Sequence, residues 1–132
     1  MARRTTILVP VDFSEASRAA VRRAQSLATE SGQGLRLLHV YAPPSADLDA
    51  RWTEALYEEL LHDSRMRLAS LAAEFDDGAL AVDTAFEEGE PARVIHDAAN
   101  EEDVSLVVMG SHGRKGFDRW LLGSVAARVV RQ

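Results

Sequence analysis

Short, continuous apolar runs alternate along the chain with longer stretches in which apolar residues recur every three or four positions. The short runs cover residues 7–11, 35–41, 80–87 and 104–109. Continuous apolar strands are typical of parallel sheets that are covered on both faces. The run 80–87 mixes apolar and polar residues, so we expect it to form an edge strand.

Helical periodicity fills the segments between these runs. Ser14 is placed to cap the first helix, and Ser31-Gly32 is typical of its end. Pro91 suits the first turn of a later helix. The apolar positions of the four expected helices are Ala16, Ala20, Ala24, Leu27 and Ala28; Trp52, Leu56, Leu60, Leu68, Leu71 and Phe75; Val94, Ile95, Ala98 and Ala99; and Val125, Ala126, Val129 and Val130.

The elements follow the order βαβαβαβα, with no linker inside the pattern and no internal repeat. Alternation of this kind predicts an α/β fold with a doubly wound, open parallel sheet and right-handed crossovers. The length of 132 residues suits one domain over residues 1–132.

Composition narrows the range of partners. The chain has 15 Lys and Arg against 21 Asp and Glu, for a net charge of −6, which argues against nonspecific binding of nucleic acid. No apolar run reaches the roughly 18 residues of a membrane span, and the first residues do not resemble a signal peptide, so we expect a cytoplasmic protein. The absence of cysteine excludes disulfides and thiol catalysis. The spacing of the histidines favours no metal site, and we expect His39 to be a satisfied sheet residue.

The segment after the last apolar run combines glycines with positive charge. Gly110 ends the run, Gly113 follows, and Gly123-Ser124 opens the last expected helix. Glycines allow the backbone to approach a ligand closely, and a helix N-terminus favours phosphate. We therefore expect an anionic ligand here. The alternative is that the glycines only interrupt a long loop between a strand and a helix. Neither a Walker P-loop nor a G-x-G-x-x-G after the first strand is present, which weakens a dinucleotide interpretation.

Five motifs in order resemble the universal stress protein family over nearly the whole chain. They are residues 7–17, Leu37 to Val40, Gly89-Glu90-Pro91, residues 106–113 and residues 121–131. The spacing Gly-x-x-Gly, followed nine residues later by Gly-Ser, resembles the family's ATP-binding signature. The resemblance implies a Rossmann-like, three-layer α/β/α fold of strand order 3-2-1-4. The nucleotide would lie between the first and fourth strands, at the switch point where open α/β sheets bind ligands.

The resemblance also implies a role for each candidate site residue. Asp12 would hydrogen-bond ribose hydroxyls. The other candidates are Pro10, Val11 and Val40 around the adenine; Met109 and Gly110 under the sugar and first phosphate; Gly113, Gly123, Ser124 and Val125 as donors to the phosphates; and the loop cations Arg114 and Lys115 nearby. The alternatives are an ordinary helix-start acid at Asp12 and an ordinary N-cap at Ser124.

The implied function is that of an ATP-binding regulatory protein of the stress response, with ATP, alone or with Mg²⁺, as its ligand. We expect no catalytic residue and no fast hydrolysis. Two alternatives remain: a protein-interaction module without nucleotide, and a slow ATPase or autokinase with Ser111 or Ser124 as acceptor. The family commonly has a fifth strand that mediates dimer contacts. This chain stops inside or just after the last expected helix, so it is a fragment or another element covers the edge, and the implied homodimer is in doubt.

Overall fold

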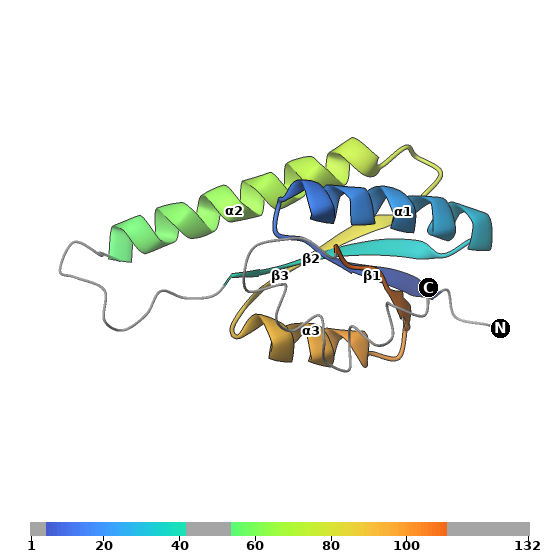
Figure 1. Cartoon of the computed structure of the whole chain (residues 1–132). Coiled ribbons are helices and arrows are strands. Elements are labelled where there is room, and N and C mark those ends of the chain that lie inside the picture. The colour runs from blue at the N-terminus through green and yellow to red at the C-terminus, as the bar shows by residue number, and fades with distance from the viewer. Residues whose placement is uncertain (1–4, 42–53, 111–132) are drawn as a thin grey trace.

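The computed structural model describes residues 5–41 and 54–110. In chain order the elements are β1 (Thr6–Pro10), α1 (Glu15–Ser31), β2 (Gly34–Tyr41), α2 (Glu54–Phe75), β3 (Val82–Glu88), α3 (Pro91–Ala99) and β4 (Val104–Val107). The strands form one parallel sheet in the order β3-β2-β1-β4. Helices α1 and α2 lie on one face of the sheet and α3 lies on the other (Figure 1).

This architecture confirms the predicted α/β fold and the strand order 3-2-1-4. The mixed run becomes β3, at an edge of the described sheet, as its composition predicts. The expected helix at residues 125–130 lies outside the described residues.

Helix α1 has the two ends that the sequence predicts. The Ser14 side chain accepts a hydrogen bond from the Ser17 N–H at 3.2 Å, which satisfies a donor that the first turn leaves unpaired. Gly32 ends the helix with a φ of 72°, a left-handed conformation that costs glycine little. The N–H of Gly32 donates to the carbonyl of Ala28. Local chemistry therefore fixes where α1 begins and ends.

Helix α3 begins at Pro91, as predicted, but its cap was missed. Glu90 precedes the helix, and its carboxylate accepts hydrogen bonds from the N–H groups of Ala92 at 3.2 Å and Arg93 at 2.9 Å. Glutamate is not among the preferred N-cap residues, so propensity alone gave no signal. A negative charge at this end also interacts favourably with the helix dipole.

The sheet separates two apolar clusters. One lies toward α1 and α2 and contains Ile7, Val9, Val11, Leu35, Leu37, Leu71 and Val108, among others. The other lies toward α3 and contains Leu8, Leu38, Ile95, Ala99, Val107 and Met109. Successive residues of β1 alternate between the two clusters because strand side chains point to opposite faces in turn.

Helix α2 is buried only in its C-terminal half. Its buried side chains are Leu68, Leu71 and Phe75. Leu56 shares their predicted apolar face, yet it is 37% exposed. The first turns of α2 extend past the end of the described sheet (Figure 1). Periodicity therefore predicts which side of a helix is apolar, but it does not predict how far the sheet reaches beneath the helix.

An ion pair crosses β1 on the α3 face. Arg36 on β2 donates to Asp103, which directly precedes β4, with 2.7 Å between Nη2 and Oδ2. Glu101 lies within 3.7 Å of the same guanidinium. The hydrogen bond to Asp103 is the main cause of a raised pKa for Arg36. This ion pair therefore connects the start of β4 to β2, across the intervening strand β1.

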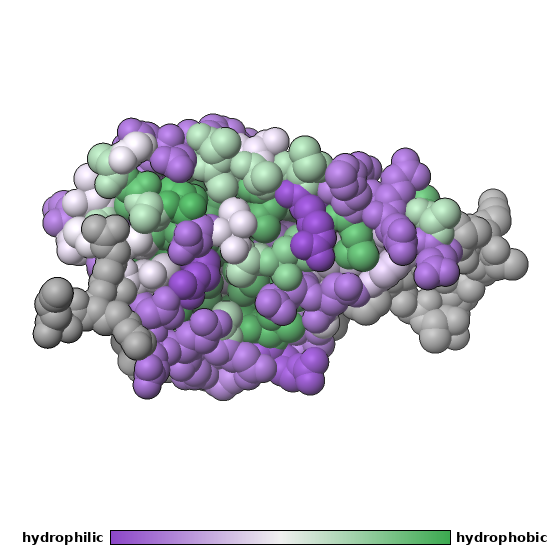
Figure 2. Space-filling model, turned by 180° about the vertical axis from the view of Figure 1, so that it is seen from behind, coloured by the Kyte–Doolittle hydropathy of each residue, from purple (hydrophilic) through white to green (hydrophobic). Residues whose placement is uncertain are grey.

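The surface of the described residues is mostly polar. Figure 2 shows the side opposite to the view of Figure 1, where hydrophobic side chains form small patches between hydrophilic ones. None of the described helices combines the length and the apolar character that crossing a bilayer requires. Within residues 5–41 and 54–110, no three side chains of the types that bind metals are grouped to hold an ion.

We predict that Ile95→Ala lowers the free energy of unfolding by about 2–5 kcal/mol, the usual loss for a fully buried aliphatic side chain. Ile95 is 0% exposed in the α3 cluster. The matched change Leu56→Ala should cost no more than about 0.5 kcal/mol, as at other exposed positions. Urea unfolding of both variants measures the difference. Equal losses of unfolding free energy in the two variants would contradict the exposed position of Leu56 in the first half of α2.

Candidate functional site

The candidate site lies at the carboxyl ends of β1 and β4, which are neighbours in the sheet. The chain leaves β1 toward β2 on one side, whereas β4 lies on the other side, so the strand order reverses here. Open α/β sheets bind ligands at such reversal points. Asp12 follows β1 and Gly110 follows β4, so two of the predicted site residues come to this end of the sheet.

Asp12 is 7% exposed and is held by hydrogen bonds to the start of α1. Its Oδ1 accepts from the Ser14 N–H at 3.0 Å, and its own N–H donates to Ser17 Oγ at 3.4 Å. The first of these bonds forms an Asx turn, which fixes the direction of the carboxylate. Asp12 therefore has a structural role at the beginning of α1. Its contact with ribose stays a prediction.

Phe13 holds a strained backbone conformation. Its φ of 67° is the one positive value for a residue other than glycine in the described parts of the chain. An L-residue in the left-handed region costs about 1–2 kcal/mol. The Phe13 ring packs against His39 at an interplanar angle of 33°, with 4.6 Å between ring centroids, and the Arg67 guanidinium lies 4.5 Å from its centroid. Strain of this kind, held by surrounding contacts, is concentrated at functional sites.

Gly110 has no room for a side chain. A Cβ atom at this position would lie 2.8 Å from the carbonyl carbon and oxygen of Ala16. Real Cβ atoms essentially never come so close, because the backbone of α1 cannot give way cheaply. Glycine at the end of β4 is therefore needed for packing against α1. The sequence suggested glycine for approach to a ligand, and the structure adds this second reason.

The structure groups some of the residues predicted to contact the adenine and the sugar, and it separates one. Val40 and Met109 both belong to the apolar cluster toward α3, and Pro10 is buried at the end of β1. Val11 instead belongs to the cluster toward α1 and α2. Its side chain packs away from Val40 and Met109, and its N–H and carbonyl are hydrogen-bonded within the sheet, to Leu38 and His39.

The predicted phosphate-binding half of the site lies outside the described residues. It comprises Gly113, Arg114, Lys115, Gly123, Ser124 and Val125, together with the alternative acceptor Ser111. The roles of these residues stay predictions.

An aromatic cluster beside the site was not foreseen. It contains Phe13, His39, Tyr41, Tyr57 and Phe86. His39 is satisfied within the sheet, as expected, because its Nδ1 hydrogen-bonds the Val11 carbonyl. Tyr57 donates a hydrogen bond to Glu88, which is the main reason that its pKa is raised to about 12. The sequence did carry one signal for this cluster: His39 and Tyr41 are two residues apart and therefore lie on one face of β2.

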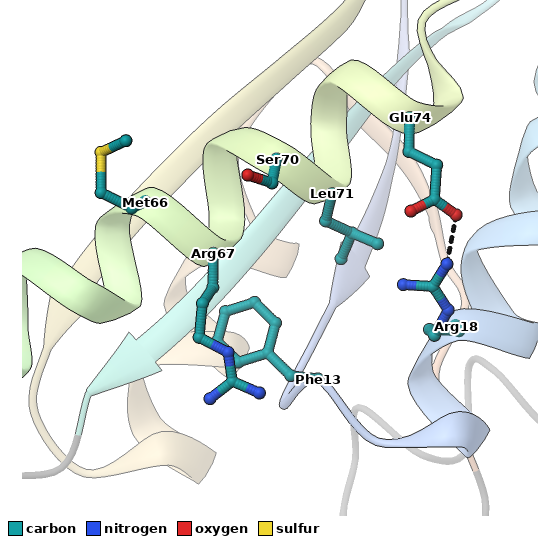
Figure 3. A pocket seen from close by; sticks show the side chains of 7 residues that line it. All are labelled: Phe13, Arg18, Met66, Arg67, Ser70, Leu71 and Glu74. Atoms are coloured by element: carbon teal, nitrogen blue, oxygen red, sulfur yellow. Dashed lines mark hydrogen bonds and ion pairs between the residues drawn. The ribbon is translucent and has the colours of Figure 1, made fainter.

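A groove of about 320 Å³ lies next to Phe13, between α1 and α2. Its lining residues are Phe13, Arg18, Met66, Arg67, Ser70, Leu71 and Glu74 (Figure 3). Arg18 and Glu74 form an ion pair across one end of it. The groove is on the α2 side of the turn, so Phe13 lies between the groove and the end of β1.

The fold and the position of the site define a doubly wound α/β protein with its candidate site at the switch point of the sheet. A model of the universal stress protein family matches residues 3–132, and the chain belongs to this family. A universal stress protein of Methanocaldococcus jannaschii is 32% identical over 127 residues, which cover 95% of this chain and 75% of that protein.

Solved structures agree with this assignment. The structure of the universal stress protein UspA from Lactobacillus plantarum has a TM-score of 0.66 and 31% identity, covering 99% of this chain and 93% of its own. The structure of a universal stress protein in complex with cAMP has a TM-score of 0.63 and 28% identity, covering 98% of this chain and 92% of its own.

We predict that Gly110→Ala lowers the free energy of unfolding by about 1–3 kcal/mol, as overpacking does elsewhere, because the new methyl group meets the α1 backbone. Gly34→Ala is the matched control. There the added Cβ would lie 3.6 Å from the nearest atom, the Ala81 carbonyl oxygen, which is ordinary contact. The control should change stability by less than about 1 kcal/mol. Denaturant unfolding compares the two, and a Gly110→Ala protein as stable as the control would refute the close contact.

Proposed function

We propose that this member of the universal stress protein family is an ATP-binding regulatory protein that acts in stress response. The observation that carries the proposal is the placement of Asp12 and Gly110 after two neighbouring parallel strands, β1 and β4, at the switch point of the sheet. The buried, oriented carboxylate of Asp12 supports it. The relative of known structure that is in complex with cAMP supports an adenine nucleotide as the class of ligand.

The proposed contacts divide the nucleotide into three parts. Asp12 accepts hydrogen bonds from the ribose hydroxyls, and carboxylates are strong acceptors for such donors. The adenine lies against Pro10, Val40 and the main chain of Val11, while Met109 and Gly110 lie under the sugar and first phosphate. The loop and last expected helix then donate to the phosphates from Gly113, Gly123, Ser124 and Val125, with Arg114 nearby. Mg²⁺, where present, would neutralise phosphate charge.

Binding without rapid turnover fits a regulatory role. The nucleotide would bias the conformation of the protein by the difference in its affinity for two states, and a partner would read that state. The proposal extends to one domain over the whole chain, which its length suits, and to a cytoplasmic location. The homodimer that the family resemblance implies is in doubt, because the fifth strand that commonly mediates dimer contacts is not part of the expected pattern.

We expect isothermal titration of the intact protein with ATP and Mg²⁺ to show saturable binding, and Asp12→Asn to weaken it at least tenfold. Asparagine keeps the acceptor for Ser14 but loses the charged acceptor for ribose, and a hydrogen bond to a charged group is worth about 1.5–3 kcal/mol. Asp76→Asn is the matched control. Asp76 Oδ1 accepts from the Gly78 N–H at 3.0 Å, the same local turn, far from the site.

Two further titrations sharpen the result. Gly113→Val should abolish binding if the loop backbone cradles phosphate. Titrations with AMP and cAMP test the preference for ATP: equal affinities would retain an adenine-nucleotide site and overturn the preference for ATP. Absence of binding by the unmodified protein, or an Asp12→Asn protein that binds like the Asp76→Asn control, would refute the proposed site.

A further inference from the structure

His39 contacts the residues on both sides of Asp12. Its Nδ1 lies 2.8 Å from the Val11 carbonyl oxygen, and its ring packs at a tilt against Phe13 with 4.6 Å between centroids. A carbonyl oxygen only accepts, so Nδ1 carries the proton in this hydrogen bond. One side chain of β2 therefore holds the residue before Asp12 and the residue after it.

Arg67 holds the same turn from helix α2. Its guanidinium carbon lies 4.5 Å from the centroid of the Phe13 ring, and Figure 3 shows the side chain reaching down from the helix to this ring. A cation near an aromatic ring is attracted to its face. Arg67 is exposed and is no part of the apolar core. It therefore links α2 to the turn from outside the apolar core.

The turn needs these contacts because Phe13 is strained. With a φ of 67°, Phe13 is kept in the left-handed region only as long as its surroundings favour that conformation. The backbone of Phe13 lies between Asp12 and Ser14, whose hydrogen bond fixes the Asp12 carboxylate. Relaxation of Phe13 would rotate the two ends of that bond relative to each other. The direction of the carboxylate thus depends on the Phe13 ring remaining in place.

We propose that His39 and Arg67 are positioning residues for nucleotide binding. His39 acts through Val11 and Phe13, and Arg67 acts through Phe13, on the Asp12 carboxylate that receives the ribose. This inference rests on the proposed function, since Asp12 is the residue assigned to ribose. It gives helix α2 an influence on nucleotide affinity although α2 has no proposed contact with the nucleotide. His39 and Arg67 are not catalytic and do not touch the ligand.

The exposed arginines of α2 provide the first test. Arg65 is the matched control for Arg67, because it is also exposed and its guanidinium lies 4.4 Å from a different ring, that of Phe86. Each alanine substitution removes one positive charge, so the long-range attraction for ATP changes alike. We expect Arg67→Ala to raise the Kd by about fivefold, the size of a cation–π contact, and Arg65→Ala by less than about twofold.

Titration with adenosine separates positioning from direct contact. Adenosine has the ribose but no phosphate, so an effect that passes through Phe13 and Asp12 should weaken adenosine and ATP by the same factor. A loss confined to ATP would mean that Arg67 touches phosphate, and it would overturn the inference.

His39 provides the second test. His39→Asn keeps an N–H donor close to the place of Nδ1, and it should bind ATP within about threefold of the unmodified protein, whereas His39→Phe keeps a ring but loses the donor and should bind about tenfold more weakly. In an Asp12→Asn background, His39→Phe should have no further effect on the Kd, because coupled residues are not additive. A purely structural role would instead give additive losses.

The outcomes separate the two proposals. If the unmodified protein binds neither ATP nor adenosine, both proposals fail. If it binds, but Arg67→Ala and His39→Phe bind equally well, the positioning role alone is overturned. Thermal unfolding of each variant accompanies the titrations. Should His39→Phe fail to fold, the Arg67 and Arg65 pair decides, because both side chains are exposed.

Discussion

Burial of β1 along its whole length is the constraint around which the molecule is arranged. All five residues from Thr6 to Pro10 are buried, with the α1 and α2 cluster on one side and the α3 cluster on the other. A strand that is apolar on both faces must have layers on both sides and neighbours on both edges, since its backbone groups also need partners. The central position in the sheet follows, and it places the carboxyl end of β1 at the switch point.

The loop after β1 shows how a costly local conformation is maintained by long-range contacts. Phe13 alone would leave its positive φ. His39 lies 28 positions away from Val11 in sequence, yet it contacts the turn on both sides of Asp12. The strain is therefore offset by contacts that exist only after β1, β2 and α2 have assembled. A turn held in this way is ordered before a ligand arrives, which lowers the entropy that binding would lose.

Packing requires a glycine after β4, and the proposed approach of a ligand would require the same. Gly110 is required because α1 passes too close for a Cβ atom. Because Gly110 lies so close to Ala16, the chain after β4 leaves the sheet beside the first turn of α1. The family membership of the chain and the position of Asp12 agree with a ligand site here, but the glycine by itself would be explained by packing alone. At both Asp12 and Gly110 a structural role is observed, and the binding role that we propose would be added to it.

The order of the elements, the helix ends at Ser14, Gly32 and Pro91, and the edge character of β3 could be read from the sequence. These features depend on periodicity, capping and composition, which act over a few residues. Three features could not be read in this way: the exposure of Leu56, the separation of Val11 from Val40, and the contacts of His39 and Arg67 with the turn that contains Asp12. They depend on the length of the sheet and on which distant side chains meet across strands and layers, and only the assembled tertiary structure decides that.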